Sequence, residues 1–220
     1  MAWLTLGGAA ERLGVSTRQV QNLIAQGRLT QVARGLVDAT SVDRLAVVRG
    51  QRHRRAWGEA RAWGAVSLLS GGDAEWMGTT QRSRLRSGLP AMSAEELVER
   101  TRERASVARY RGHSSVLDHV RDALVTTADA GRRLGLAEAQ RVDGYLAAED
   151  LADVVERNGL VRDDDGAIAL RATTMDLESV REITDRGLVL AALDHAESLD
   201  VRERRAGLDE LQRALVKLRG

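Results

Sequence analysis

Two short segments near the start of the chain have the apolar spacing of helices. The first segment places its apolar residues at Leu6, Ala9, Ala10 and Leu13. Thr5 can cap the start of this helix, and Gly14 follows its last apolar residue, where helices often end with a positive φ. The second segment covers residues 17–26, with Ser16 as its cap and Gly27 as its stop. The pattern therefore predicts two helices joined by a three-residue turn.

The second predicted helix has an apolar and a polar face. Its inward positions and the residue that precedes it are Val15, Val20, Leu23 and Ile24. Its outward positions hold Thr17, Arg18, Gln21 and Asn22. Arginine, glutamine and asparagine make bidentate contacts to base edges, and the second helix of a helix-turn-helix enters the major groove through its N-terminal residues. The candidate DNA-binding residues are Ser16, Thr17, Arg18, Gln19, Gln21, Asn22, Arg28 and Arg34.

Strand-forming residues follow the two helices. They are Leu29, Val32, Leu36 and Val37. Because they surround Arg34 and Gly35, they predict a short hairpin whose tip could touch the DNA backbone or the minor groove. Thr40 or Ser41 then caps a third helix that begins at Val42. Two helices, a hairpin and a third helix are the elements of a winged helix-turn-helix.

The order and spacing of these residues resemble the MerR and excisionase class of winged helices. The matching positions are residues 9–16 (AAERLGVS), Val20, Leu23, Ile24, residues 27–29 and residues 41–45. The resemblance covers about a fifth of the chain and implies a module that binds double-stranded DNA. The alternative is a helical hairpin that only packs against another part of the protein.

Residues 46–69 are predicted to form one long helix, which extends the DNA-binding domain over residues 1–70. Trp57 and Trp63 repeat at a six-residue interval, and we expect them to pack in a core rather than along a dimer seam. The helix also carries Arg49, Arg52, His53, Arg54, Arg55 and Arg61. These basic residues could contact phosphates or form a solvated face.

The remaining sequence predicts a connecting helical region over residues 71–111 and an α+β domain over residues 112–220. The connecting region holds the alternating Arg82, Arg84 and Arg86, a helix over 94–104 capped by Ser93, and a short strand over 107–110. The last domain holds helices over 117–124, 148–157, 188–198 and 201–218, the last capped by Asp200, an extended stretch over 142–145, and a hairpin of strands 160–162 and 167–171. Its helix and hairpin are winged-helix-like in outline. The predicted fold class is mainly α with small β-hairpins, or α+β.

Charge is unevenly distributed along the chain. Residues 1–111 carry 18 Arg against 10 Asp and Glu, a net charge of +8. Residues 112–220 carry 14 Arg and Lys217 against 22 acidic residues, a net charge of −7. The basic half could meet phosphates, and the acidic half suits a basic protein better than it suits nucleic acid. The alternative is two neutralising faces of one fold.

The composition is that of an ordinary globular protein, with 43% hydrophobic and 30% charged residues. Because the chain has no cysteine, it can form neither disulfides nor thiolate metal sites. No stretch approaches the ~20 apolar residues of a membrane span. The first residues also lack the basic and apolar regions of a signal peptide. We therefore expect a cytoplasmic protein with no membrane partner.

Candidate catalytic residues and metal ligands are few. The four histidines, which lack metal-ligand spacing, are His53, His113, His119 and His195. Residues 163–166 (DDDG) lack the alternating ligands of a calcium loop, so we expect a solvated turn. The paired glycines lack the spacing of a phosphate-binding loop. The sequence therefore predicts no enzymatic activity, no cofactor and no metal.

The whole chain is also similar to actinobacterial antitoxin-type regulators related to the AbiEi antitoxins of type IV toxin–antitoxin pairs. The similarity is carried by helical motifs in residues 55–71 and 189–204. It implies an autoregulating repressor whose acidic half neutralises a nucleotidyltransferase-like toxin. The leading hypothesis is a sequence-specific DNA-binding transcriptional regulator, with two copies on an inverted repeat. The alternatives are a stand-alone homodimeric regulator without a toxin, and a module that binds only protein.

Overall fold

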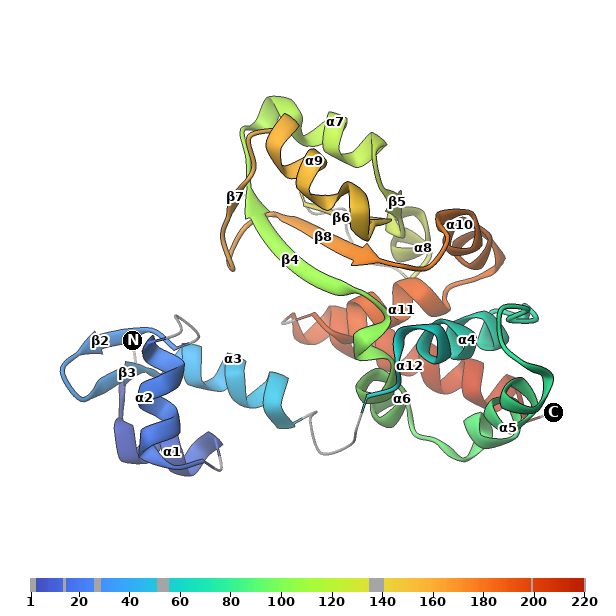
Figure 1. The fold of residues 1–220 in the computed structure, drawn as a ribbon. Coiled ribbons are helices and arrows are strands. Elements are labelled where there is room, and N and C mark those ends of the chain that lie inside the picture. Colours follow the sequence, from blue (N-terminus) through green and yellow to red (C-terminus); the bar gives the residue numbers. More distant parts are fainter. Residues whose placement is uncertain are drawn as a thin grey trace. The chain divides into compact units, whose positions relative to one another are not determined.

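A computed structural model describes residues 3–13, 15–25, 29–50, 56–134, 141–198 and 200–219. The chain folds as two compact units, residues 1–55 (unit 1) and residues 56–220 (unit 2) (Figure 1). Both units contain helices and strands, so the predicted α+β class is confirmed at that level. Among the described residues, no helix has both the length and the apolar character needed to cross a membrane.

Unit 1 combines helices with a small antiparallel sheet. Its elements are β1 (Trp3–Thr5), α1 (Leu6–Leu13), α2 (Thr17–Ala25), β2 (Gln31–Ala33), β3 (Leu36–Asp38) and α3 (Ala39–Gly50). The strands lie in the order β1-β3-β2, so the predicted hairpin forms and gains β1 as a third strand. The core of the unit consists of Ala9, Ala10, Leu13, Val20, Leu23, Leu29, Val37, Val42 and Leu45. The helix pair and the hairpin therefore share one apolar core.

Side chains predicted to cap the first two helices do so. Thr5 Oγ1 accepts a hydrogen bond from the Gly8 N–H at 3.1 Å. Ser16 Oγ accepts one from the Gln19 N–H at 3.3 Å. Each cap satisfies one of the backbone donors that a helix leaves free at its start.

The predicted cap of the third helix is wrong. The helix begins at Ala39 rather than after Thr40 or Ser41, because Asp38 Oδ2 accepts the Ser41 N–H at 2.9 Å. Ser41 has a different role, since its hydroxyl donates to the Asp38 carbonyl at 2.8 Å and accepts the Thr30 N–H at 3.2 Å. Ser41 thus ties the start of α3 to the residue that precedes β2.

The single helix predicted over residues 46–69 is also wrong. Helix α3 ends at Gly50, and α4 (Glu59–Leu69) begins after Gly58. Gly58 adopts an extended conformation, with φ −62° and ψ 156°, which no helix can pass through. Helix α4 belongs to unit 2, so the first unit ends at residue 55 rather than 70. The region expected to connect two domains, residues 71–111, is likewise part of unit 2.

Unit 2 surrounds a sheet with helices. Its helices after α4 are α5 (Thr79–Gly88), η1 (Leu89–Ala91), α6 (Ala94–Thr101), η2 (Arg102–Arg104), η3 (Ser114–Val116), α7 (Leu117–Asp122), α8 (Ala128–Arg133), η4 (Ala148–Asp150), α9 (Leu151–Arg157), α10 (Leu177–Arg186), α11 (Val189–Ala196) and α12 (Val201–Lys217). Its strands are β4 (Ser106–Arg111), β5 (Val125–Thr126), β6 (Val142–Ala147), β7 (Val161–Arg162) and β8 (Ile168–Thr173). Ser93 and Asp200 cap α6 and α12 as predicted.

The strands of unit 2 lie in the order β5-β6-β8-β4-β7. Strands β6 and β8 are parallel, and the other pairs are antiparallel. The predicted hairpin of residues 160–171 is therefore wrong, because β4 lies between β7 and β8. Tyr110 of β4 pairs with Arg162 on one side and with Ile168 on the other. The second winged-helix-like unit, which the sequence predicted from this hairpin, is therefore also wrong.

A glycine lets the chain cross from β7 to β8. Gly166 lies so close to β4 that a Cβ on it would stand 2.1 Å from the Tyr110 carbonyl oxygen. Any other residue would clash with the backbone of β4 at this point. The acidic stretch before Gly166 thus forms a crossover rather than the tip of a two-stranded hairpin.

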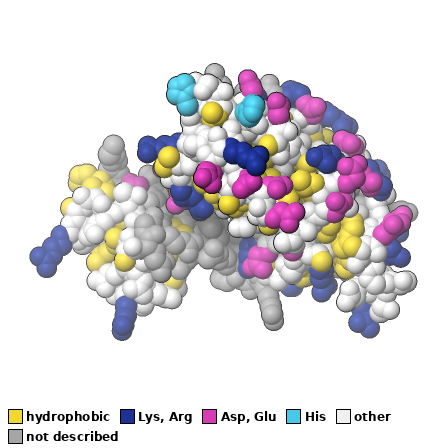
Figure 2. Space-filling view, turned by 45° about the horizontal axis from the view of Figure 1, so that its top comes forward, with side chains coloured by type: hydrophobic (Ala, Val, Ile, Leu, Met, Phe, Trp, Pro, Cys, Tyr) yellow, Lys and Arg dark blue, Asp and Glu magenta, His cyan; other side chains and the backbone are white. Residues whose placement is uncertain are grey.

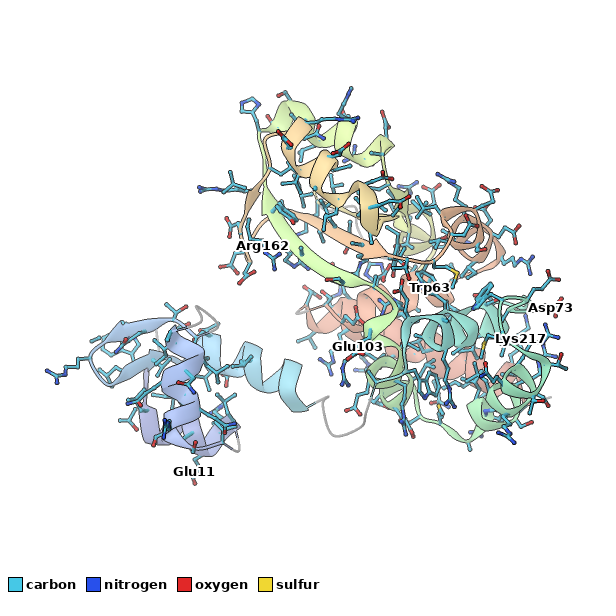
Figure 3. The ribbon with its side chains drawn as sticks, in the orientation of Figure 1. Glu11, Trp63, Asp73, Glu103, Arg162 and Lys217 are labelled. Carbon is cyan, nitrogen blue, oxygen red and sulfur yellow. The ribbon has the colours of Figure 1, made fainter. Side chains whose placement is uncertain are left out.

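Helices cover both faces of the sheet (Figure 1). On one face, α7 and α9 pack on a core that includes Val120, Val142, Leu146, Ile168 and Leu170. On the other face, Trp63 of α4 (labelled in Figure 3) meets Tyr145 of β6 edge to face, and their ring centroids are 5.4 Å apart. Every residue of β8 is buried, and the strand is apolar apart from Arg171 and Thr173.

A cluster of buried charged side chains joins the sheet to α11. Asp194 of α11 accepts hydrogen bonds from Arg104 Nη2 at 2.7 Å and from the Tyr145 hydroxyl at 2.5 Å. Its second oxygen accepts one from Thr127 Oγ1 at 3.1 Å. Arg104 also donates to Glu197 at 2.7 Å. One carboxylate is therefore held from β6, from η2 and from the residue that precedes α8.

Arg171 of β8 extends this cluster. It donates to the two carboxylate oxygens of Asp143 at 2.6 and 3.0 Å and to Glu197 at 3.1 Å. Two guanidinium groups thus face three carboxylates. Charges can be buried at tolerable cost only with such partners, and the removal of one partner leaves the others uncompensated.

We expect Arg104→Met to destabilise unit 2 by about 3–5 kcal/mol, because the buried carboxylate of Asp194 loses its closest cation. Urea unfolding followed by circular dichroism would measure the change. Arg181 of α10 is exposed and provides a matched control, since Arg181→Met should change the free energy of unfolding by at most about 0.5 kcal/mol. An Arg104→Met protein as stable as the control would contradict the structural role of the cluster.

The same cluster predicts a pH dependence. Burial alone would raise the pKa of Asp194, but the charges of Arg171 and Arg104 hold this pKa below its usual value. The carboxylate therefore stabilises the folded state above its unfolded pKa of about 3.9, and this contribution is lost as the pH falls through the folded pKa. Melting curves between pH 3 and pH 7 should show wild type and Asp194→Asn far apart near neutrality and converging in acid. A constant difference between the two would contradict the assignment.

Candidate nucleic-acid interface

Helix α2 presents a continuous polar surface to solvent. The residues of this surface, all exposed, are Ser16, Thr17, Arg18, Gln19, Gln21 and Asn22. Val20 and Leu23 lie on the opposite side of the helix and are buried in the core of unit 1. The 3.6-residue period of the helix thus separates the two faces as the sequence predicted.

The start of α2 is fixed in two ways. The Ser16 side chain caps the helix, and the Val15 N–H donates to the Ala10 carbonyl of α1 at 3.0 Å. The Ser16 hydroxyl therefore has a structural role, because its oxygen already accepts the Gln19 N–H. The exposed side chains of Thr17 and Arg18 stand at the positive end of the helix dipole, which favours a nearby phosphate.

The hairpin of unit 1 places a second basic group at the surface. Arg34 is exposed in the turn between β2 and β3, and Gly35 supplies the positive φ of 82° that the turn needs. Every residue of β2 is exposed, and Val32 keeps 48% of its surface in contact with solvent. The hairpin therefore has an open face that nothing in the described part of unit 1 covers.

Unit 1 is strongly basic for its size. Residues 1–55 contain nine arginines and three acidic residues, a net charge of +6, whereas residues 56–220 contain 24 basic and 29 acidic residues, a net charge of −5. Arg12 is paired with Asp43 at 2.6 Å. Among the described residues, no carboxylate pairs with Arg18 or Arg34. Figure 2 shows arginine side chains that project from this unit into solvent.

The structure describes most of the predicted DNA-binding residues. It brings the five predicted positions of α2 together on one helix with its cap Ser16, and it places Arg34 at the hairpin turn. Arg28 lies outside the described residues. Nothing in the described structure contradicts the predicted set, and contact of these residues with DNA stays a prediction.

Sequence reasoning missed the buried charged cluster of unit 2. Arg104 and Asp194 are 90 residues apart, and no motif links them. The available signal was weak, namely a charged residue inside each of two apolar runs, Arg171 in a strand and Asp194 in a helix. Each charged group is bonded to another member of the cluster, which makes it a structural assembly.

The histidines of unit 2 do not gather into a site. His113 and His119 are exposed, and His195 lies against Gly131. In the described part of the chain, no three His, Cys, Asp or Glu residues are placed to hold a metal ion.

We compared the chain with protein-family models, with curated proteins and with solved structures, and none of them matches.

The cap of α2 can be tested directly. Ser16→Ala should destabilise unit 1 by about 1 kcal/mol, because the Gln19 N–H loses its acceptor. Ser16→Asp should retain the stability, since aspartate caps helices as well as serine. Thermal unfolding would measure both variants, and equal loss in both would mean that the hydroxyl does something other than cap the helix.

Proposed function

We propose that unit 1 binds double-stranded DNA and that α2 enters the major groove. The observation that carries this proposal is the exposed polar face of α2. In the described part of the chain, the side chains of Thr17, Arg18, Gln21 and Asn22 make no hydrogen bond to the rest of the protein. A helix with four such side chains near its N-terminus presents donors and acceptors that are free to meet base edges.

The individual side chains suit different contacts. Arg18 can donate two hydrogen bonds to guanine O6 and N7, and Gln21 or Asn22 can pair with adenine N6 and N7. Thr17, beside the free backbone donors of the first turn, suits a phosphate oxygen. Arg34 at the hairpin turn suits the backbone or the minor groove next to the site. The winged helix-turn-helix arrangement accounts for all of these positions.

Unit 1 alone is too small for tight specific binding. Single DNA-binding modules bury about 600–1,000 Å² of protein surface, whereas specific complexes commonly bury 1,000–2,500 Å². Two copies on an inverted repeat would supply the missing surface. We therefore propose a sequence-specific transcriptional regulator that acts as a pair.

The substitution that tests this function is Arg18→Ala. A preferred site would first be selected from random duplex DNA with the full chain. On that site, loss of a bidentate contact should weaken binding by about 1–3 kcal/mol and relax the base preference at one position. Fluorescence anisotropy would measure the affinity, and a repeat of the selection would measure the preference.

Arg181→Ala is the matched control, since Arg181 is exposed on α10 and is paired with Glu178 on the same helix. It should leave affinity and preference unchanged. Failure of the full chain to retain any duplex DNA in the selection would refute the proposed function. DNA binding that Arg18→Ala leaves intact would refute α2 as the reading helix.

The partner expected for the acidic half stays a prediction. The net charge of −5 on residues 56–220 suits a basic protein, as the antitoxin resemblance implies. A cytoplasmic location likewise stays an expectation from the sequence.

A further inference from the structure

Helix α5 gives unit 2 a basic surface, although the unit as a whole is acidic. The helix carries Arg82, Arg84 and Arg86, and none of residues 76–94 is acidic. Leu85 is the one residue of α5 that is buried. The helix therefore lies on the surface of unit 2 and shows most of its circumference to solvent.

The arrangement of side chains around α5 leaves a narrow polar strip between two arginines. At about 100° per residue, Ser83 and Ser87 lie opposite the buried Leu85. Arg84 and Arg86 then flank this strip, one on each side. The Ser87 hydroxyl donates to the Ser83 carbonyl at 2.9 Å, so the strip is small and polar, and the flanking arginines supply the donors for the oxygens of a polyanion.

Several exposed arginines on other helices of unit 2 are paired with acids on the same helix. These pairs are Arg121 with Asp118, Arg157 with Asp153, Arg181 with Glu178, Arg186 with Glu182, and Arg213 with Glu210. Helix α5 contains no acidic residue. In the part of the chain that the structure describes, no carboxylate pairs with Arg84 or Arg86, and Arg82 donates to the backbone carbonyl of Asp73 at 3.1 Å. The charge of α5 is thus available to an external anion.

Arg219, which follows α12, adds to this charge. Lys217 (labelled in Figure 3) and Arg219 are both exposed, and Arg219 Nε donates to the Pro90 carbonyl at 2.6 Å, just beyond α5. Asp73 and Glu75, which precede α5 in the sequence, are exposed. We call Arg82, Arg84, Arg86 and Arg219 the α5 surface.

We propose that the α5 surface binds the phosphate backbone of double-stranded DNA that unit 1 holds. The inference rests on the proposed function of unit 1. Only five residues, 51–55, separate the last residue of α3 from unit 2, so DNA on unit 1 is present at a high effective concentration around unit 2. The α5 surface offers arginines beside small hydroxyl groups. Such a surface suits phosphates, which fix the position of the protein on the DNA but carry no sequence information.

The test compares two double variants of the full chain on the selected duplex, extended on both sides. Arg84→Gln with Arg86→Gln removes two charges from the α5 surface. Arg181→Gln with Arg186→Gln removes two charges from α10, where each arginine has an acidic neighbour. All four side chains are exposed, so melting temperatures should match that of the wild type.

The expected result is a smaller salt dependence for the α5 variant alone. Each lost phosphate contact lowers the slope of log K against log salt by about 0.9, so two contacts lower it by roughly 1.8 and weaken binding roughly 60-fold at 0.1 M salt. The ratio of specific to unrelated DNA should not change. Arg84→Lys with Arg86→Lys keeps the charge and should restore the slope.

The outcomes separate this inference from the proposed function. If the wild type binds DNA and Arg18→Ala weakens it, an unchanged slope in the α5 variant overturns the role of α5 alone. An equal fall in slope for the α10 variant would also overturn it, because the effect would then follow net charge. If the wild type binds no duplex DNA, both proposals fail.

Discussion

The carboxylate of Asp194 is the point at which the layers of unit 2 meet. It sits at the end of an apolar helical run, and its burial is tolerable only because Arg104 and Arg171 bring positive charge to it from η2 and β8. Tyr145 adds a donor from β6. A shift of any one layer would leave a buried charge without a partner, so the cluster ties these layers to one register. The parallel pairing of β6 with β8 places Tyr145 opposite Arg171, which lets both side chains reach the same carboxylate.

Local signals in the sequence predicted the fold of unit 1 well. The caps at Thr5 and Ser16, the apolar period of α2 and the turn at Gly35 each act within a few residues, and each is confirmed. The missed features of unit 2 depend on contacts over long separations. Nothing in residues 160–171 reveals that a strand from residues 106–111 lies between their two halves. The helix predicted across residue 58 is also wrong, since residues 56–58 are not helical and Gly58 is extended.

The candidate site was predictable for the same reason that unit 1 was. The polar face of α2 is encoded by the helical period of nine residues, and its exposure follows once Val20 and Leu23 are buried. Helical periodicity alone does not predict the basic α5 surface. The sequence displays Arg84 and Arg86, but only the structure shows that one buried leucine anchors the helix and that Arg219 of the distant C-terminus lies beside it. Charged residues in a sequence form a basic surface only where the folded neighbours leave them exposed and without acidic partners.

The position of β4 between β7 and β8 has a consequence for the order in which the chain can fold during synthesis. Unit 1 is complete once residue 55 has left the ribosome, whereas the sheet of unit 2 cannot close until residue 173 has followed. At translation rates of about 5–20 residues per second, the interval is roughly 6–24 s. Strand β4 ends at residue 111, so for the last 62 residues of this interval, roughly 3–12 s, it waits with open edges after the first unit has acquired a finished surface.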